Sequence, residues 1–234
     1  MKDKIAIVAD IHANIHALNT FLEYIKENNI NKVLNLGDFV QIGPNPKEVT
    51  EIILGDSRFI NILGNNEISL FDIDENDTSS EIAHRVWTKK QINEYMDDIK
   101  KLPETNIVEM NGLKLLMIHS RKGNASGKPL IYKESMQSFE EDYQEFETNF
   151  ILFGHTHEKM LIEHHNKIYI NPGSLGCSYN KNADFVILEL QDGQIEKCTF
   201  ESLKYDKNLV IKDYLKNEVP DREFILKNFY GYSI

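Results

Sequence analysis

The feature that most constrains this chain is a series of short apolar runs, each of which ends in aspartate, asparagine or histidine. The run Ile151–Phe153 is typical of a buried strand, and Gly154 leads from it directly into His155-Thr156-His157. Alternate residues of a strand point in opposite directions, so His155 and His157 would face the same way if the strand continued. A turn after Gly154 would instead direct the two imidazoles towards neighbouring metal ions. A His-x-His pair alone is weak evidence for such a site.

Four other apolar runs end in a similar way. The residues that follow the five runs are Asp10 and His12, Asp38, Asn65, His119, and His155 and His157. Ligand sites of open α/β sheets lie beyond the carboxyl ends of the strands, so these seven residues can converge although they are far apart in sequence. Each one alone has an ordinary explanation as a helix cap, a turn residue or a single hydrogen-bonded side chain. Seven of them at strand ends favour one shared site.

The donor types indicate which ions such a site would bind. Carboxylate, amide and imidazole groups together suit Mn, Fe, Zn or Ni better than Ca. Seven donors are too many for one ion, but they fit two ions that share a carboxylate. An amidohydrolase metal site is a competing interpretation of the His-x-His pair. In that family, however, the pair normally lies on the first strand, whereas here it comes late and Asp10-x-His12 comes first.

The order of the predicted elements indicates an α/β fold. Strands over 5–9, 32–36 and 59–63 alternate with helices that begin at Ile15 and Pro46, which implies parallel pairing with right-handed crossovers. We predict one domain over residues 1–234, with a C-terminal helical extension from about residue 205. The other predicted elements are helices from Ser79 or Ser80, from Asn93 and over 135–149, hairpins over 107–118 and 183–203, and paired strands over 159–163 and 167–171.

Composition narrows the range of partners. Lys and Arg number 26 against 37 Asp and Glu, a formal charge of -11, and an acidic surface disfavours binding of a nucleic-acid polymer. The first apolar run is too short for a signal peptide or a membrane span, and no later segment is long enough. We therefore predict a cytoplasmic protein without a membrane partner, while the oligomeric state is left open. Cys177 and Cys198 are expected to be reduced and not catalytic.

These motifs resemble the calcineurin-like metallophosphoesterase superfamily, and within it the small bacterial phosphodiesterases and diadenosine tetraphosphatase-related proteins. The motifs that carry the resemblance are Asp10-x-His12, Gly37-Asp38, Gly64-Asn65-x-Glu67, His119 and Gly154-His155-Thr156-His157. The likeness extends to Trp87-Thr88 and to Asn171-Pro172-Gly173-Ser174, so it covers nearly the whole chain. It implies a four-layer α/β/β/α sandwich around a binuclear metal centre.

The resemblance also implies how the ligands divide between two divalent ions, with manganese as the first choice and Fe, Zn or Ni as alternatives. One ion would take Asp10, His12, Asp38 and His157, and the other would take Asp38, Asn65, His119 and His155. Two such ions generate hydroxide at neutral pH and clamp a phosphoryl oxygen. The implied activity is hydrolysis of phosphodiester or phosphoanhydride bonds in a small, nucleotide-like substrate, with Asp38, Asn65 and His119 as catalytic residues.

One position departs from the superfamily pattern. Many members have histidine where this chain has Asn66, and that histidine assists the leaving group, whereas asparagine cannot act as a general acid near neutral pH. The candidates to replace it are His16, His84 and Arg121; otherwise, the substrate has a good leaving group. We also predict that Asn66, Arg121 and Lys122 contact the substrate, because the basic pair lies just after His119.

Three other functions share the same motifs. A phosphomonoesterase is one alternative, and a protein phosphatase is another, although the latter usually has an arginine soon after Gly-Asp and residues 39–46 contain none. A non-catalytic interaction scaffold, as in the related retromer subunit, is the third. Because that subunit has lost a metal-site histidine and this chain has all four, catalysis is favoured.

Overall fold

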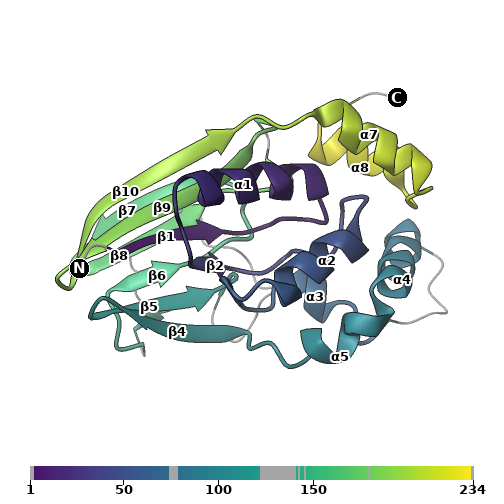
Figure 1. Cartoon of the computed structure of the whole chain (residues 1–234). Coiled ribbons are helices and arrows are strands. Elements are labelled where there is room, and N and C mark those ends of the chain that lie inside the picture. Colours follow the sequence, from purple (N-terminus) through teal and green to yellow (C-terminus); the bar gives the residue numbers. More distant parts are fainter. Residues whose placement is uncertain are drawn as a thin grey trace.

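The computed structural model describes residues 3–73, 79–121, 141, 143–144, 146–178 and 180–232, and it contains two five-stranded sheets (Figure 1). The strands are β1 (Asp3–Val8), β2 (Val33–Asn35), β3 (Phe59–Asn61), β4 (Thr105–Met110), β5 (Leu113–Ile118), β6 (Phe150–Leu152), β7 (Lys159–His164), β8 (Lys167–Pro172), β9 (Ala183–Gln191) and β10 (Gln194–Leu203). The helices are α1 (Ile15–Glu27), α2 (Pro46–Gly55), α3 (Asn65–Ile68), α4 (Ser80–Gln91), the 3-10 helix η1 (Asn93–Tyr95), α5 (Met96–Ile99), α7 (Lys207–Lys216) and α8 (Arg222–Phe229).

The first sheet has the strand order β10-β9-β1-β2-β3. Strands β1, β2 and β3 are parallel, with Ala6 opposite Val33 and Val33 opposite Phe59. Strands β9 and β10 form an antiparallel hairpin on the other side of β1. The strand–helix order of residues 5–63 therefore gives the predicted parallel pairing, and the hairpin over 183–203 completes the sheet.

The second sheet has the strand order β4-β5-β6-β8-β7. Its three central strands, β5, β6 and β8, are parallel to one another, and the antiparallel strands β4 and β7 form its two edges. The carboxyl ends of β5 and β6 therefore lie at the same edge of this sheet. Metal-ligand candidates follow both of these strands.

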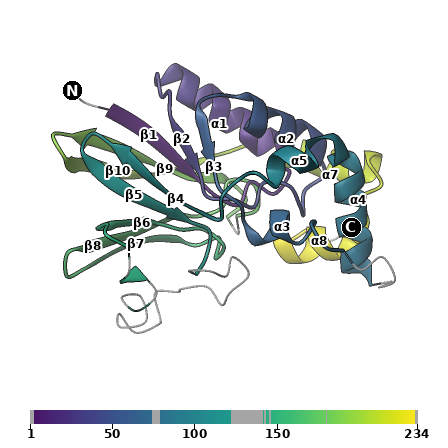
Figure 2. The same ribbon diagram turned by 90° about the horizontal axis from the view of Figure 1, so that it is seen from below.

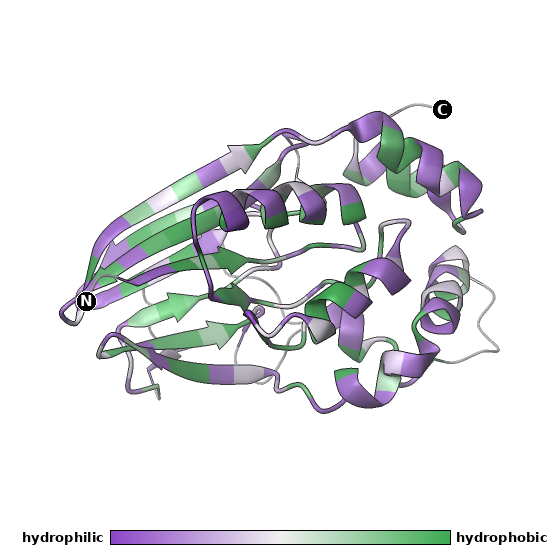
Figure 3. Cartoon of the chain, viewed as in Figure 1, coloured by the Kyte–Doolittle hydropathy of each residue, from purple (hydrophilic) through white to green (hydrophobic). Residues whose placement is uncertain are grey.

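The main core between the sheets follows the alternation of the strands. Ile5 and Ile7 of β1 face Leu115 and Met117 of β5 in one buried cluster, whereas Ala6 and neighbouring residues of β1 pack on the opposite side against helices. Figure 3 shows hydrophobic residues concentrated on the strands and mixed hydropathy on the helices. Because β1 is buried on both faces, the loop that follows it begins from a fixed position.

Helices cover the outer face of the first sheet. Asn14 caps α1 by accepting a hydrogen bond from the backbone N–H of Ala17, and the helix buries Leu18 and Phe21 against β9 and its neighbours. Figure 2 shows α3, α4 and α8 gathered at one end of the molecule, beyond the ends of the strands. None of the described helices is long and apolar enough to cross a membrane.

The outer face of the second sheet packs against the segment that contains Tyr143. This tyrosine is fully buried against Tyr169 and Ile151, and its hydroxyl donates to the carbonyl oxygen of Ser120. Most of the helix predicted over 135–149 lies outside the described residues, and residues 146–149 are not helical. The α/β class and the two-sheet sandwich are confirmed. Two helices, α7 and α8, lie near the C-terminal end.

Candidate metal centre

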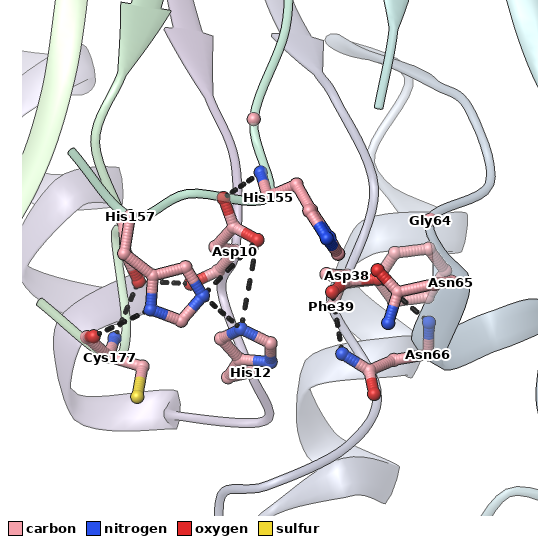
Figure 4. Close-up of polar contacts among 12 residues, drawn as sticks. Asp10, His12, Asp38, Phe39, Gly64, Asn65, Asn66, His155, His157 and Cys177 are labelled. Atoms are coloured by element: carbon pink, nitrogen blue, oxygen red, sulfur yellow. Dashed lines mark hydrogen bonds and ion pairs between the residues drawn. The ribbon is translucent and has the colours of Figure 1, made fainter. Parts of the chain in front are cut away.

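Ends of five strands, from both sheets, meet at one place. Asp10 and His12 follow β1, Asp38 follows β2, and Asn65 begins α3 directly after β3. His119 follows β5, and the loop after β6 carries the two remaining histidines. Figure 4 shows that Asp10, His12 and His157 lie on one side of this site and Asp38, Asn65 and Asn66 on the other. The structure thus brings together all seven predicted ligand positions.

Five of these seven residues have a left-handed backbone conformation. The φ angles are +55° for Asp10, +45° for His12, +58° for Asp38, +69° for His155 and +58° for His157. Such angles cost roughly 1–2 kcal/mol for an ordinary residue and tend to cluster at functional sites. Because β6 ends at Leu152, the backbone turns and sends His155 and His157 to different clusters. They do not alternate along an extended strand.

The first cluster consists of Asp10, His12 and His157, whose ligand atoms lie within 4.8 Å of one another. The two imidazole Nε2 atoms are 2.9 Å apart, and Asp10 Oδ1 lies 3.7 Å from that of His12 and 3.5 Å from that of His157. Asp10 Oδ1 is buried and accepts no hydrogen bond from the described residues. His157 Nδ1 lies 3.1 Å from the carbonyl oxygen of Cys177, so Nδ1–H donates there and Nε2 faces the cluster.

The buried carboxylate of Asp10 favours a positive charge at the centre of this cluster. Burial opposes charging of His157, but Asp10 outweighs burial and raises the pKa of His157 well above its usual value. Burial and His157 lower the pKa of His12 to about 4. The Nε2 atoms of both imidazoles face one carboxylate oxygen, Asp10 Oδ1. A divalent cation fits this arrangement of donors, and two neutral imidazoles and a carboxylate would bind it.

The second cluster consists of Asp38, His119 and His155, again with ligand atoms within 4.8 Å of one another. His119 Nε2 lies 3.3 Å from Asp38 Oδ2, 3.3 Å from His155 Nδ1 and 3.1 Å from Asn65 Oδ1. His119 Nδ1 lies 2.7 Å from the carbonyl oxygen of Leu36, so this nitrogen donates to the backbone and Nε2 faces the cluster. Burial opposes protonation, but Asp38 raises the pKa of His119 to about 9.

Asn66 lies against Asp38, at the position where the superfamily pattern has its acid. Its backbone N–H donates to Asp38 Oδ1 at 2.8 Å, and its side-chain amide donates to Oδ2 at 2.6 Å. Burial opposes ionisation of Asp38, but His119, His12 and the Asn66 N–H together lower the pKa of the carboxyl group. The amide thus holds a charged carboxylate that faces His119.

A glycine makes the close approach of two strand ends possible. Gly37 has a φ of +92°, and a Cβ atom there would lie 2.4 Å from the backbone nitrogen of Gly64. A Cβ atom on Gly64 would in turn lie 2.1 Å from Asp38 Oδ1. Any larger residue at either position would push the loop of Asp38 away from α3.

Glu67 supports the site from the protein interior, and the ligand pattern did not single it out. It is fully buried, and its carboxylate accepts four backbone hydrogen bonds, from Gly64, Asp38, Phe39 and Val40, at 2.7–3.1 Å. Burial and Asp38 raise the pKa of Glu67 to about 7, whereas the four N–H groups favour its charged form. The side chain joins the two loops that present Asp38 and Asn65. Its position within Gly64-Asn65-x-Glu67 is the signal in the sequence that could have identified it.

Replacement of Glu67 by glutamine is expected to destabilise the protein and weaken metal binding. The amide cannot accept hydrogen bonds through its nitrogen, so at least one buried N–H loses its acceptor, at a cost of about 1–3 kcal/mol. Loss of such a supporting contact typically lowers metal affinity about 10–100-fold. Thermal unfolding and manganese titration would measure both effects, with Glu48→Gln on exposed α2 surface as the control. Unchanged manganese affinity in Glu67→Gln would contradict the supporting role.

The end of β8 and the loop that follows it position the two neighbouring strand ends. The side-chain amide of Asn171 donates to the carbonyl oxygen of Gly154 at 2.8 Å and to Thr156 Oγ1 at 3.0 Å. The hydroxyl of Ser174 donates to the carbonyl oxygen of Asp10 at 2.7 Å and accepts from the N–H of Cys177. These contacts explain why Asn171-Pro172-Gly173-Ser174 belongs to the site although none of its side chains is in either cluster.

The remaining predicted residues lie at different distances from the centre. A hollow of about 320 Å³ lies over both clusters, and its lining includes Asn66 but not Arg121. Arg121 is half-buried beyond the end of β5, and Lys122 lies outside the described residues. Their predicted contact with substrate stays a prediction. His16 pairs with Asp213 of α7 at 2.8 Å and also does not line the hollow.

Comparison with known proteins gives the family of the chain. Residues 4–193 match the model of the calcineurin-like phosphoesterase superfamily domain. The chain belongs to this superfamily. It therefore belongs to a family of metal-dependent phosphoesterases, and the strand-end motifs from Asp10 to His157 all lie within the matched region.

Known proteins resemble the chain over nearly its whole length. Uncharacterized protein MJ0912 of Methanocaldococcus jannaschii is 30% identical over 94% of this chain and 96% of its own length. The crystal structure of hypothetical protein PH1004 from Pyrococcus horikoshii OT3 has a TM-score of 0.82 at 18% identity, covering 99% of each chain. A metallophosphoesterase from Sphaerobacter thermophilus has a TM-score of 0.75 at 21% identity, covering 97% of this chain and 98% of its own. These structural likenesses concern the fold.

Proposed function

We propose that the protein is a binuclear metallophosphoesterase that hydrolyses phosphodiester or phosphoanhydride bonds of small, nucleotide-like substrates. The observation that carries this proposal is the pair of three-residue clusters, Asp10-His12-His157 and Asp38-His119-His155, beside one open hollow. Each cluster combines imidazoles with one carboxylate, a donor set that suits Mn, Fe, Zn or Ni. Both clusters are complete, which favours catalysis over a role as an interaction scaffold.

The proposed ligand sets extend each cluster by a neighbouring residue. One ion would be held by the first cluster together with Asp38, and the other by the second cluster together with Asn65, so that Asp38 is shared. Two bound ions activate water and neutralise charge on a phosphoryl oxygen. The chain itself orients the ligands, because the Nδ1–H groups of His119 and His157 donate to backbone carbonyls. Phosphoryl transfer needs little more from the protein than positioning and charge.

The charge of the molecule supports a small phosphorylated substrate. The formal charge is -11, so an anion would bind best where the ions provide local positive charge. Among the described residues, the hollow over the clusters is lined by five of the proposed ligands together with Ile42, Asn66, Thr156 and Phe229, and none of these last four is basic. Recognition of the phosphate would therefore depend on the metals, and activity should disappear when they are removed.

The test is reconstitution of metal-depleted protein with manganese, followed by metal analysis and assays on diesters, monoesters, phosphopeptides and dinucleoside polyphosphates. We expect two ions per chain, and activity on diesters or anhydrides that exceeds activity on monoesters and phosphopeptides. His157→Ala should lose one ion and the activity, whereas His165→Ala, in the turn between β7 and β8, should keep both. One ion or none at saturating manganese would refute the binuclear proposal, and a preference for monoesters or phosphopeptides would point to the alternative phosphatase activities.

A further inference from the structure

A second pocket adjoins the hollow over the clusters. It has a volume of about 420 Å³, within the usual range of small-molecule sites, and lies between α4 and α8. Ile42, Asn66 and Phe229 line both cavities, so the two are immediate neighbours. Figure 2 shows α4 and α8 at the same end of the molecule as α3, which carries Asn66. A substrate whose phosphate lies at the clusters could therefore extend into this pocket.

The lining combines apolar surfaces with polar edges. Phe224 of α8 is 55% exposed although it is a large aromatic residue, and it lines the pocket together with Phe229 and Ile225. The polar residues of the lining include Gln41, Asn66 and His84. An aromatic ring system with polar atoms at its edges matches such a lining, because its faces stack on phenylalanine and its edges form hydrogen bonds.

The charges of the pocket disfavour a second anionic group. Its charged residues are Arg85, Glu81 and Asp221, and Arg85 pairs with Glu81 one turn earlier on α4. The net charge of this lining is therefore negative. His84 adds no positive charge, because burial lowers its pKa to about 4 and its Nε2 accepts the N–H of Ile42 at 3.0 Å. A further phosphate would be repelled here, whereas an uncharged ring would not.

We propose that the pocket between α4 and α8 binds an uncharged, flat heterocyclic group of the substrate, such as a nucleobase, while the phosphate lies at the two clusters. This inference rests on the proposed function, since it assigns the part of the substrate that is not transferred. Phe224 is the specificity-determining residue, and it takes no part in holding the metals.

The direct test measures binding of thymidine to the metal-loaded protein by calorimetry, with deoxyribose as the control ligand. We expect saturable binding of thymidine only, weakened about tenfold or more in Phe224→Ala, as is usual for loss of a stacking contact. Phe224→Trp should retain binding. Leu215→Ala is the matched control, because Leu215 is 50% exposed on neighbouring α7 and does not line the pocket. Equal binding by wild type and Phe224→Ala, or none by wild type, would overturn the inference.

A kinetic experiment distinguishes failure of this inference from failure of the proposed function. Thymidine 5′-(p-nitrophenyl phosphate) and methyl p-nitrophenyl phosphate both react with water to release p-nitrophenolate and leave a monoester. We expect a KM at least about tenfold lower for the thymidine ester, a preference that is lost in Phe224→Ala and kept in Leu215→Ala. If the manganese enzyme cleaves neither ester, the proposed function fails while thymidine binding still tests the pocket. Cleavage of both esters with equal KM values would contradict the assignment of the pocket and leave the proposed function intact.

Discussion

Replacement of Asp38 by alanine is expected to remove the activity almost completely. Asp38 is the one carboxylate that both proposed ligand sets share, and it is buried between His119 and Asn66. Loss of a supporting contact to a ligand commonly costs about 10–100-fold, so loss of a shared ligand should cost roughly 10³-fold or more in kcat/KM. His12→Ala, which removes a donor from one cluster only, should cost less.

Metal analysis of both variants distinguishes the causes of such losses. Asp38→Ala should retain fewer than two ions at manganese concentrations that saturate the wild type, whereas His12→Ala should retain the ion at Asp38, His119 and His155. Asp38→Asn keeps the volume of the side chain and separates loss of charge from a packing defect. Two tightly bound ions in Asp38→Ala, with activity reduced no more than in His12→Ala, would show that Asp38 is not shared.

The positions of the ligands could be predicted because short apolar runs indicate strands. Runs such as Ile5–Ala9 and Ile151–Phe153 are fully buried, as their apolar composition predicts. The residues that follow each strand lie beyond its carboxyl end, where ligand sites of such sheets are found. Parallel pairing of β1, β2 and β3 then places Asp10 and Asp38 at the same edge. Both steps depend on local hydrophobic patterns, which the sequence shows directly.

The geometry within the site could not be predicted in the same way. The residues next to the left-handed His155 and His157 are held by contacts from another segment, such as the hydrogen bonds from Asn171 to Gly154 and Thr156. The choice of Nε2 in His157 depends on the carbonyl oxygen of Cys177, twenty residues along the chain. The hydrophobic pattern of the sequence does not indicate such long-range contacts. The same holds for the pocket between α4 and α8, whose two walls are more than a hundred residues apart in sequence.

The surroundings of Asn66 bear on how a leaving group would depart. Of the candidate replacements for the missing acid, His84 is neutral, with a pKa lowered to about 4 by burial, and its Nε2 accepts the N–H of Ile42. His16 pairs with Asp213 outside the hollow, and the guanidinium of Arg121 does not give up a proton near neutral pH. None of these three candidates is therefore a suitable general acid for a substrate in the hollow.

We accordingly expect the enzyme to depend steeply on the pKa of the leaving group. Nitrophenyl diesters and phosphoanhydrides should be hydrolysed far faster than alkyl diesters, because their leaving groups depart without a proton. General acid catalysis is typically worth about 10²–10⁴-fold, so Asn66→His should raise kcat for alkyl esters by about 10²-fold and change nitrophenyl esters little. Asn66→Ala is the control, since it removes the hydrogen bond to Asp38 Oδ2 without adding an acid.

Two measurements make this result unambiguous. Metal content must be determined for each variant, because the new imidazole lies beside Asp38 and could bind an ion instead of donating a proton. The pH profile for an alkyl ester should gain a limb in Asn66→His that falls as pH rises through the pKa of the imidazole, because only its protonated form donates. Similar chemical-step rates for alkyl and nitrophenyl esters in the wild type would show that another acid is present. Asn66 would then serve only to hold the Asp38 carboxylate.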